Sequence, residues 1–190
     1  MKLYEKLPDS VIVDGHVVRL DLDFRNVIKF IETLSQDDLM PKAREYLALK
    51  CICKHPRQGM MTPVRRLLFP ETGSESTEKI TDFIQDADLI RAAFLQAYGI
   101  NLFRDKLHWF EFSCLLSCIP SGTKYSEVIQ IRAKPIPAPT KWNTEERAWL
   151  MKAKHEFGIK LTEEEQAKKY EKSVKNIGQM LSALVGDGEK

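Results

Sequence analysis

The chain has 190 residues, of which 43% are hydrophobic and 29% charged, values that are ordinary for one globular domain with an appendage. Its formal net charge of +2 argues against strong electrostatic attraction to nucleic acid or to an anionic membrane. No apolar run approaches the ~20 residues that span a bilayer, and the N-terminal residues lack the apolar core of a signal peptide.

Residues 10–20 predict a β-hairpin. Two β-branched runs, Val11-Ile12-Val13 and Val17-Val18, flank Asp14-Gly15, a pair that tolerates the positive φ angles of a two-residue turn. Two strands alone are marginally stable in water, so we expect the hairpin to pack on helices or to pair with another chain. An exposed strand edge here would be a natural site for self-association.

Two helices are predicted after the hairpin. Asp21 or Asp23 can cap the first, over about residues 24–34. Its apolar face follows helical spacing and consists of Phe24, Val27, Ile28, Ile31 and Leu34. Pro41 suits the first turn of the second helix, which we expect to end at about Lys54.

A short helix and a polar loop come next. Thr62-Pro63 is expected to begin the helix and Pro70 to end it. Residues 71–78, with the sequence ETGSESTE, are polar and low in complexity, which predicts a mobile loop and the best internal site for proteolytic cleavage.

Residues 82–133 form the block around which the chain is expected to fold. Apolar residues from Phe83 to Tyr98 recur with a helical period, and Gly99 is a typical helix stop. Asp105 can cap a second helix to about Cys118 that is apolar nearly all round, which is typical of a central helix. Thr123 can cap a third helix with Val128, Ile129 and Ile131. We expect these helices to build the core.

The C-terminal part begins with a proline-rich linker. Residues 135–141 favour an extended, semi-rigid segment, followed by a helix that Asn143 or Thr144 can cap and that Gly158 ends. Thr162 and Glu165 fit a capping box for a further helix. Because aromatic and apolar side chains anchor interfaces, we take five residues as candidates for partner contact, although core packing is the alternative: Trp142, Trp149, Val174, Ile177 and Leu181.

Two clusters contain residue types that could form a chemical site. Cys51-x-Cys53-x-His55 could contribute to a metal site, but its spacing is tighter than in structural zinc sites, and the alternative is that all four cysteines are buried apolar thiols. His108 and Glu111 resemble half of a di-iron motif in reverse order; the alternative places them at the edge of the core. Without a phosphate loop or nucleophile elbow, we expect no catalytic residues, no metal, no cofactor and no enzymatic activity.

Residues 162–181 carry an alternative function. Their spacing fits a helix-turn-helix unit in which Ser173 caps a recognition helix that exposes Lys175 to DNA. Glu171 at the turn and the acidic run 163–165 argue against this reading. The other interpretation is an amphipathic helix that docks on the core or on a partner, so nucleic acid is not the expected ligand.

The chain is thus expected to be mainly α. It would have a helical domain over residues 1–134 with a small N-terminal β-hairpin, the linker 135–141, and a C-terminal helical segment over residues 142–190.

The central block resembles the bacteriophage "gene product fifteen" family, small tail-region proteins of phages. The N-terminal half matches more loosely, through the hairpin and Asp23-Phe24-Arg25. The closer match consists of Asp86, Asp88, Ile90, Ala92-Ala93-Phe94, Tyr98-Gly99-Ile100, Leu102, Leu107-His108-Trp109, Phe112, Leu115, Ile119-Pro120, Thr123-Lys124, Ile129 and Ile131-Arg132.

This resemblance implies a role in phage tail morphogenesis in the host cytoplasm, without a membrane partner. The most direct implication is a tail assembly chaperone that binds the tape measure protein, with contact to the tail tube protein and self-association as further expectations. A structural tail component that stays in the virion is the other reading. The family supplies no catalytic residues that could be transferred to this chain.

Overall fold

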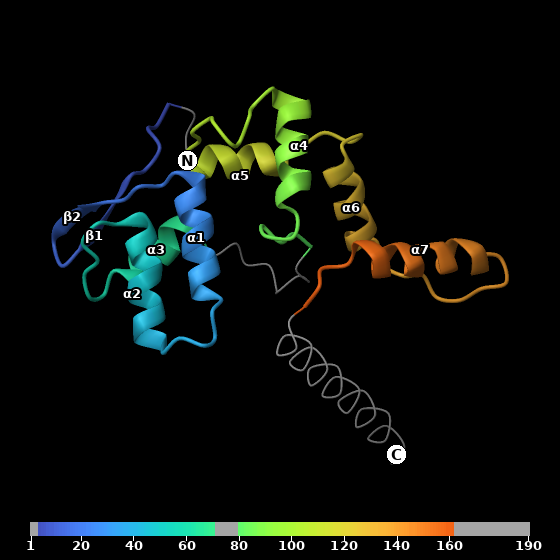
Figure 1. Ribbon diagram of the computed structural model, residues 1–190, viewed down its shortest axis with the longest axis horizontal. Coiled ribbons are helices and arrows are strands. Elements are labelled where there is room, and N and C mark those ends of the chain that lie inside the picture. The colour runs from blue at the N-terminus through green and yellow to red at the C-terminus, as the bar shows by residue number, and fades with distance from the viewer. Residues whose placement is uncertain (1–3, 71–79, 162–190) are drawn as a thin grey trace, which may run out of the picture. The chain divides into compact units, whose positions relative to one another are not determined.

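The protein is seen here in a computed structural model that describes residues 4–70 and 80–161 (Figure 1). The chain divides into two units, residues 1–134 and residues 135–190, and each is described by itself. The described residues form a two-stranded antiparallel sheet and seven helices, so the expected mainly α fold is confirmed.

The predicted hairpin is confirmed. Strand β1 (Ser10–Val13) pairs with β2 (His16–Arg19), and both turn residues, Asp14 with φ 49° and Gly15 with φ 75°, have positive φ. Such a turn matches the natural twist of the strands. The sheet packs through β1 against α3 (Met61–Leu68), and Ile12 and Val17 face each other on its outer side, 68% and 69% exposed.

Helix α1 (Phe24–Leu34) begins as predicted, and the structure selects Asp23 as its cap, because the Asp23 carboxylate accepts from the backbone N–H of Arg25 at 3.0 Å. Helix α2 (Pro41–Ile52) begins at the predicted proline, ends two residues before Lys54, and packs along α1. The predicted loop over residues 71–78 lies outside the described residues.

Helix α4 (Ala87–Tyr98) starts four residues after Phe83, the residue at which the apolar period begins. The Asp82 carboxylate accepts from the backbone N–H groups of Ile84 and Gln85, both at 2.9 Å, so residues 82–86 form a separate turn. The predicted stop is confirmed, because Gly99 adopts the left-handed conformation with φ 68°.

Helix α5 (Trp109–Ser117) starts three residues later than expected, and the assignment of Asp105 as its cap was wrong. The cap is His108. Its ring nitrogen Nδ1 accepts from the backbone N–H of Phe110, and its own backbone N–H donates to the Glu111 carboxylate. Asp105 instead accepts from the Asn101 N–H at 2.7 Å and closes the link after α4. Helix α6 (Lys124–Ala133) has the predicted cap, Thr123.

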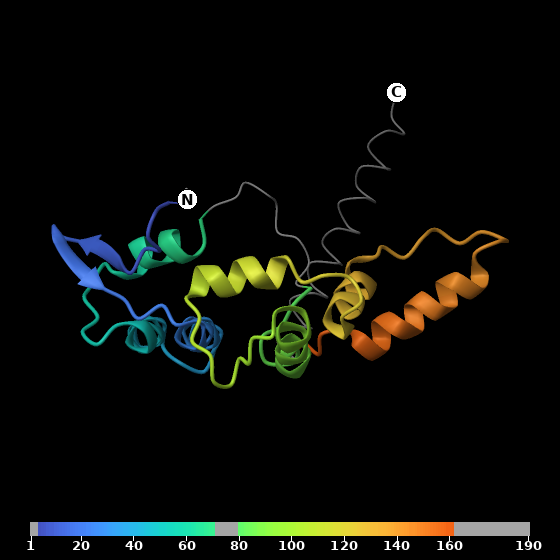
Figure 2. The same ribbon diagram turned by 90° about the horizontal axis from the view of Figure 1, so that it is seen from above.

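The core centres on Phe112 of α5, which is 1% exposed. Its ring stacks on Phe24 of α1 at 4.6 Å and on Phe94 of α4 at 5.2 Å. Figures 1 and 2 show α5 running across from α1 to α4. The core is therefore wider than the expected trio α4, α5 and α6, because α1 contributes the fully buried Val27 and Phe30.

The assignment of all four cysteines to the core was wrong. Cys53 is buried and Cys51 half-buried, but Cys114 and Cys118 at the C-terminal end of α5 are exposed. Helix α5 carries more apolar residues than its buried face can hold, so some of them lie at the protein surface.

The second unit contains α7 (Thr144–Phe157), which has the predicted bounds. Asn143 precedes it but makes no capping bond; its side chain bonds to the backbone of Thr140 and Ala138 instead. Gly158 follows the helix in an extended conformation, where an added Cβ would lie 2.5 Å from the Lys154 carbonyl oxygen. Within the described ranges, no helix is long and apolar enough to cross a membrane.

Candidate functional site

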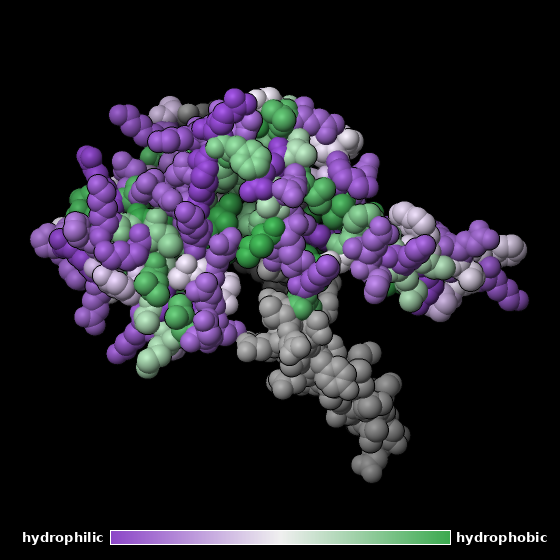
Figure 3. Space-filling model, in the orientation of Figure 1, coloured by the Kyte–Doolittle hydropathy of each residue, from purple (hydrophilic) through white to green (hydrophobic). Residues whose placement is uncertain are grey.

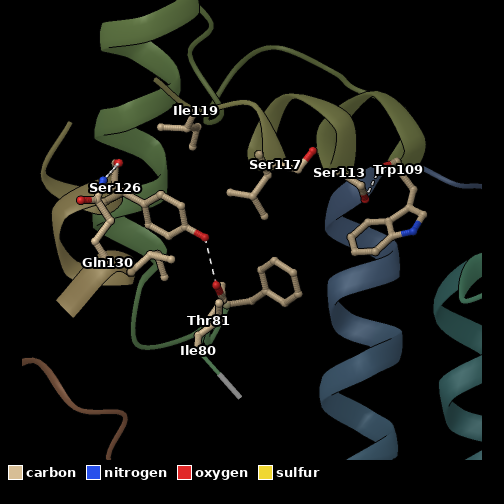
Figure 4. Close-up of a pocket in the computed structure, with 12 residues that line it drawn as sticks. Ile80, Thr81, Trp109, Ser113, Ser117, Ile119, Ser126 and Gln130 are labelled. Atoms are coloured by element: carbon tan, nitrogen blue, oxygen red, sulfur yellow. Dashed lines mark hydrogen bonds between the residues drawn. The ribbon is translucent and has the colours of Figure 1, made fainter. Parts of the chain in front are cut away.

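An open apolar cleft of about 450 Å³ lies between α5 and α6 (Figure 4). Ile80, Thr81 and Phe83, which precede α4, line it together with the two helices. Its larger apolar side chains are Ile80, Phe83, Trp109, Leu116, Ile119 and Ile129, and its polar ones are Thr81, Ser113, Ser117, Tyr125, Ser126 and Gln130.

A buried ion pair fixes one wall of this cleft. Arg132 of α6 donates two hydrogen bonds to the Asp86 carboxylate, at 2.6 and 2.8 Å, and the side chains are only 10% and 2% exposed. Arg132 also donates to the Ile80 carbonyl oxygen at 3.0 Å, and Asp86 accepts from the Asp82 N–H at 2.9 Å. The segment before α4 is thereby tied to α6 by directional, charge-assisted bonds.

A second polar contact joins the segment before α4 to α6. The hydroxyl groups of Thr81 and Tyr125 lie 3.0 Å apart in hydrogen-bond contact. Burial of the Tyr125 side chain raises its pKa above the usual 10.0; the Thr81 bond and Arg132 oppose this rise, and the Asp86 charge adds to it. The phenol is therefore neutral at physiological pH and serves as a structural hydrogen-bonding group.

The chemistry of the cleft suits binding more than reaction. Within the described part of the chain, the residues that line it include no charged side chain, histidine or cysteine. The hydroxyls of Ser113 and Ser117 donate to helix carbonyl oxygens, at 2.8 Å each, and neither has an adjacent base within this lining. Apolar walls with a few neutral hydrogen-bonding groups fit the apolar side chains of a ligand or partner.

Neither chemical cluster from the sequence forms a site in the part of the chain that the structure describes. No group of three or more histidine, cysteine, aspartate or glutamate side chains there could hold a metal ion. His108 and Glu111 cap α5. The His108 Nε2 atom also lies 3.1 Å from the Pro8 carbonyl oxygen, which ties the chain before β1 to α5.

Two of the five candidate partner-binding residues, Trp142 and Trp149, are among the described residues. Trp142 and Trp149 belong to the second unit and are 95% and 58% exposed. Val174, Ile177 and Leu181 lie outside the described residues, as does the proposed helix-turn-helix over 162–181. The aromatic pair remains available to a partner, and its role stays a prediction.

Sequence reasoning missed the cleft because it assigned Leu116, Ile119 and Ile129 to the core. These side chains are only partly buried at its margin. One signal was present in the sequence: α5 carries apolar residues on more of its circumference than one packing face can cover. Nothing local, however, pairs Asp86 with Arg132, which stand 46 positions apart.

A comparison with protein families gives one match. The model of the family described as "Bacteriophage Gp15 protein" matches residues 3–159, well over half of the chain and all of the cleft. Neither the curated proteins nor the solved structures contain a match.

Proposed function

The chain belongs to the bacteriophage Gp15 protein family, and on this premise we propose that it is a tail assembly chaperone that binds the tape measure protein in the host cytoplasm. It would act by binding and would catalyse no reaction. The tail tube protein would take its place as the tube forms around the tape measure.

The observation that carries the proposal is the uncharged apolar cleft between α5 and α6. A tape measure protein is expected to be long, helical and prone to aggregate through its apolar stripes before the tube surrounds it. An amphipathic helix that lays its apolar face into a groove is a recurrent mode of recognition. Side chains such as Leu116 and Ile129 would shield one short stretch of such a stripe.

Displacement by the tube requires each contact to be of modest affinity, so many copies would have to act together. Self-association would raise their combined affinity. The outer side of the hairpin supports this part of the proposal, because Ile12 and Val17 form an exposed cross-strand apolar pair beside outer strand edges that no other described strand pairs with.

The test is co-expression of the tape measure protein with the full chain or its variants. We expect the chain to keep the tape measure in the soluble fraction and to co-purify with it, and Leu116→Glu with Ile129→Glu to abolish both effects. The matched control is Leu95→Glu, which changes a 55% exposed leucine of α4 that does not line the cleft. Circular dichroism should show native helix content in every variant.

Two outcomes would contradict the proposal. The tape measure could stay equally soluble without the chain, or the cleft variants could retain it as well as the control does. Mass spectrometry of purified virions distinguishes a chaperone from a structural tail component, because a chaperone should be absent from the finished particle.

A further inference from the structure

An open groove of about 680 Å³ lies between strand β2 and the chain that leaves the end of α2. We call it the β2 groove; residues 17–21 line one side, and residues 50–55 with Arg57 line the other. Figures 1 and 2 both show the hairpin beside the chain that joins α2 to α3, and Figure 3 shows hydrophilic side chains projecting from that end of the first unit. We propose that the β2 groove binds an extended acidic segment of a partner protein, which pairs with the outer edge of β2 as a third strand.

The outer edge of β2 offers backbone hydrogen-bonding groups. In a two-residue hairpin the two residues that flank the turn form a hydrogen-bonded pair, and such pairs then alternate along the strands. The 2.7 Å bond from the Leu20 N–H to the Asp9 carbonyl oxygen confirms this alternation. The N–H and C=O groups of Val17 and Arg19 therefore point away from β1, and no bond within the described residues uses them. An unpaired edge of this kind is a template for a further strand.

The opposite wall leaves this edge accessible. The Asp21 N–H donates to the Ile52 carbonyl oxygen at 2.8 Å, which joins the end of β2 to the end of α2. No other backbone bond among the described residues links residues 17–20 to residues 53–57. The two walls are therefore held together at one end only, and the groove runs along the β2 edge from there.

The charges that line the groove select the guest. Four lining side chains are cationic and one is a carboxylate, that of Asp21. The four cations are all exposed: Arg19, Lys50, Lys54 and Arg57. None of them forms an ion pair in the part of the chain that the structure describes. Lys50 contacts neutral groups, the Lys54 carbonyl oxygen at 3.0 Å and the Tyr46 ring at 5.8 Å, so its charge is not offset. This uncompensated positive charge favours an acidic guest.

An extended polypeptide fits the edge better than other occupants do. The edge alternates N–H donors with C=O acceptors, as a peptide backbone does, whereas the phosphate backbone of a nucleic acid has acceptors only and would leave those carbonyl groups without a donor. A second copy of this chain would bring the same four cations to the edge, and like charges repel. A guest strand lies in the plane of the sheet, so it does not cover the outer face on which self-association was proposed.

This proposal goes beyond tape measure binding and does not depend on it. The test is fluorescence anisotropy of the full chain with four labelled probes. Three are peptides of about eight residues, within the usual length of a strand, with valine at every second position. The other positions hold glutamate in the first peptide and lysine in the second, and the third is the glutamate peptide with every backbone nitrogen methylated. The fourth probe is a single-stranded oligonucleotide with the net charge of the glutamate peptide.

We expect the glutamate peptide to bind, more weakly as salt rises, and the lysine peptide to show no binding. Methylation should weaken binding at least tenfold, because it removes the N–H groups that strand pairing requires while it keeps the charge. The oligonucleotide should bind more weakly than the glutamate peptide.

Proline variants locate the edge. Val17→Pro removes an outward N–H from β2 and should weaken binding of the glutamate peptide by about tenfold, because an edge strand tolerates proline where the N–H faces outward. Ser10→Pro makes the same change on the outer edge of β1 and should leave the affinity nearly unchanged. Circular dichroism should show native structure in both variants.

Charge reversal tests the selection of the guest at exposed positions, so this arm decides even if a proline variant unfolds. Lys54→Glu with Arg57→Glu should weaken binding of the glutamate peptide by about tenfold or more. The matched control, Lys42→Glu with Arg104→Glu, reverses one exposed lysine and one exposed arginine outside the groove and should leave the affinity nearly unchanged.

The proposal is overturned if no peptide binds, if the glutamate and lysine peptides bind alike, or if methylation leaves the affinity unchanged. It is overturned equally if a control variant weakens binding as much as its groove counterpart, or if the oligonucleotide binds more tightly than the glutamate peptide. None of these outcomes bears on tape measure solubility, so failure here leaves the proposed chaperone function standing, and failure there leaves the β2 groove standing.

Discussion

Replacing Asp86 by alanine tests the role of the ion pair that holds the cleft together. The variant removes the Asp86 carboxylate from the Arg132 guanidinium, which is only 10% exposed, and it also removes the acceptor of the Asp82 N–H. The Arg132 bond to the Ile80 carbonyl oxygen survives but cannot neutralise the charge.

The expected loss of stability is large because both charges are buried. Removing one partner of a buried, doubly hydrogen-bonded pair costs about 3–5 kcal/mol, since the remaining charge is desolvated without compensation. For a chain of this size such a loss corresponds to a fall of roughly 6–20 °C in Tm. Arg132→Met should cost a similar amount, because it removes the guanidinium that pairs with the buried Asp86 carboxylate.

The assay is urea unfolding of the full chain followed by circular dichroism. The control is Asp88→Ala in the first turn of the same helix, where the ion pair with Arg91 is exposed and the loss should be ~1 kcal/mol or less. The double variant Asp86→Ala, Arg132→Met removes both charges and should be less destabilised than either single variant.

The reasoning would be refuted by a loss from Asp86→Ala no larger than that from Asp88→Ala. Additive losses in the double variant would be equally damaging, because they would show that the two side chains do not interact energetically.

Three further predictions concern single positions. Tyr125→Phe should cost about 1 kcal/mol below pH 10 through loss of the Thr81 bond. Because burial raises the Tyr125 pKa, its phenol ionises at a lower pH in the unfolded chain than in the folded chain. The stability advantage of the wild type over Tyr125→Phe should therefore shrink as the pH rises above ~10. A difference in unfolding free energy between the two proteins that does not change with pH would contradict this. Gly99→Ala should lower stability in thermal unfolding by about 1 kcal/mol from backbone strain alone, since nothing lies within 4 Å of the added Cβ; an unchanged Tm would refute it. Asp23→Ala should cost about 1–2 kcal/mol in urea unfolding and Asp21→Ala clearly less, so equal losses would count against Asp23 as the cap.

Local chemistry made several elements predictable. The hairpin follows from Asp14-Gly15, because a two-residue turn with positive φ admits few residue types. Asp23 and Thr123 cap helices through bonds to residues two or three positions away. The same locality explains why Pro41 begins α2 and why Gly99 ends α4.

Local chemistry misled where two signals competed. The apolar period from Phe83 is continuous, yet the helix does not begin until Ala87. The turn capped by Asp82 and the ion pair between Asp86 and Arg132 hold the preceding residues in a non-helical conformation. Asp105 is a good cap by type, but its carboxylate bonds to Asn101 in the link. His108 prevails as the cap because β-bridge pairing with Asp23 fixes where α5 begins.

The amino-acid sequence by itself determined the mainly α fold, the hairpin and most helix ends, because these depend on dihedral preferences and hydrogen bonds within a few residues. Only the tertiary structure decided which apolar side chains stay at the surface. Leu116 and Phe103 look like core residues by type, but Leu116 lines the cleft and Phe103 is 72% exposed, because the aromatic stack on Phe112 fills the interior without them. The joining of Asp86 to Arg132 likewise depends on how α4 and α6 pack, which no local pattern encodes.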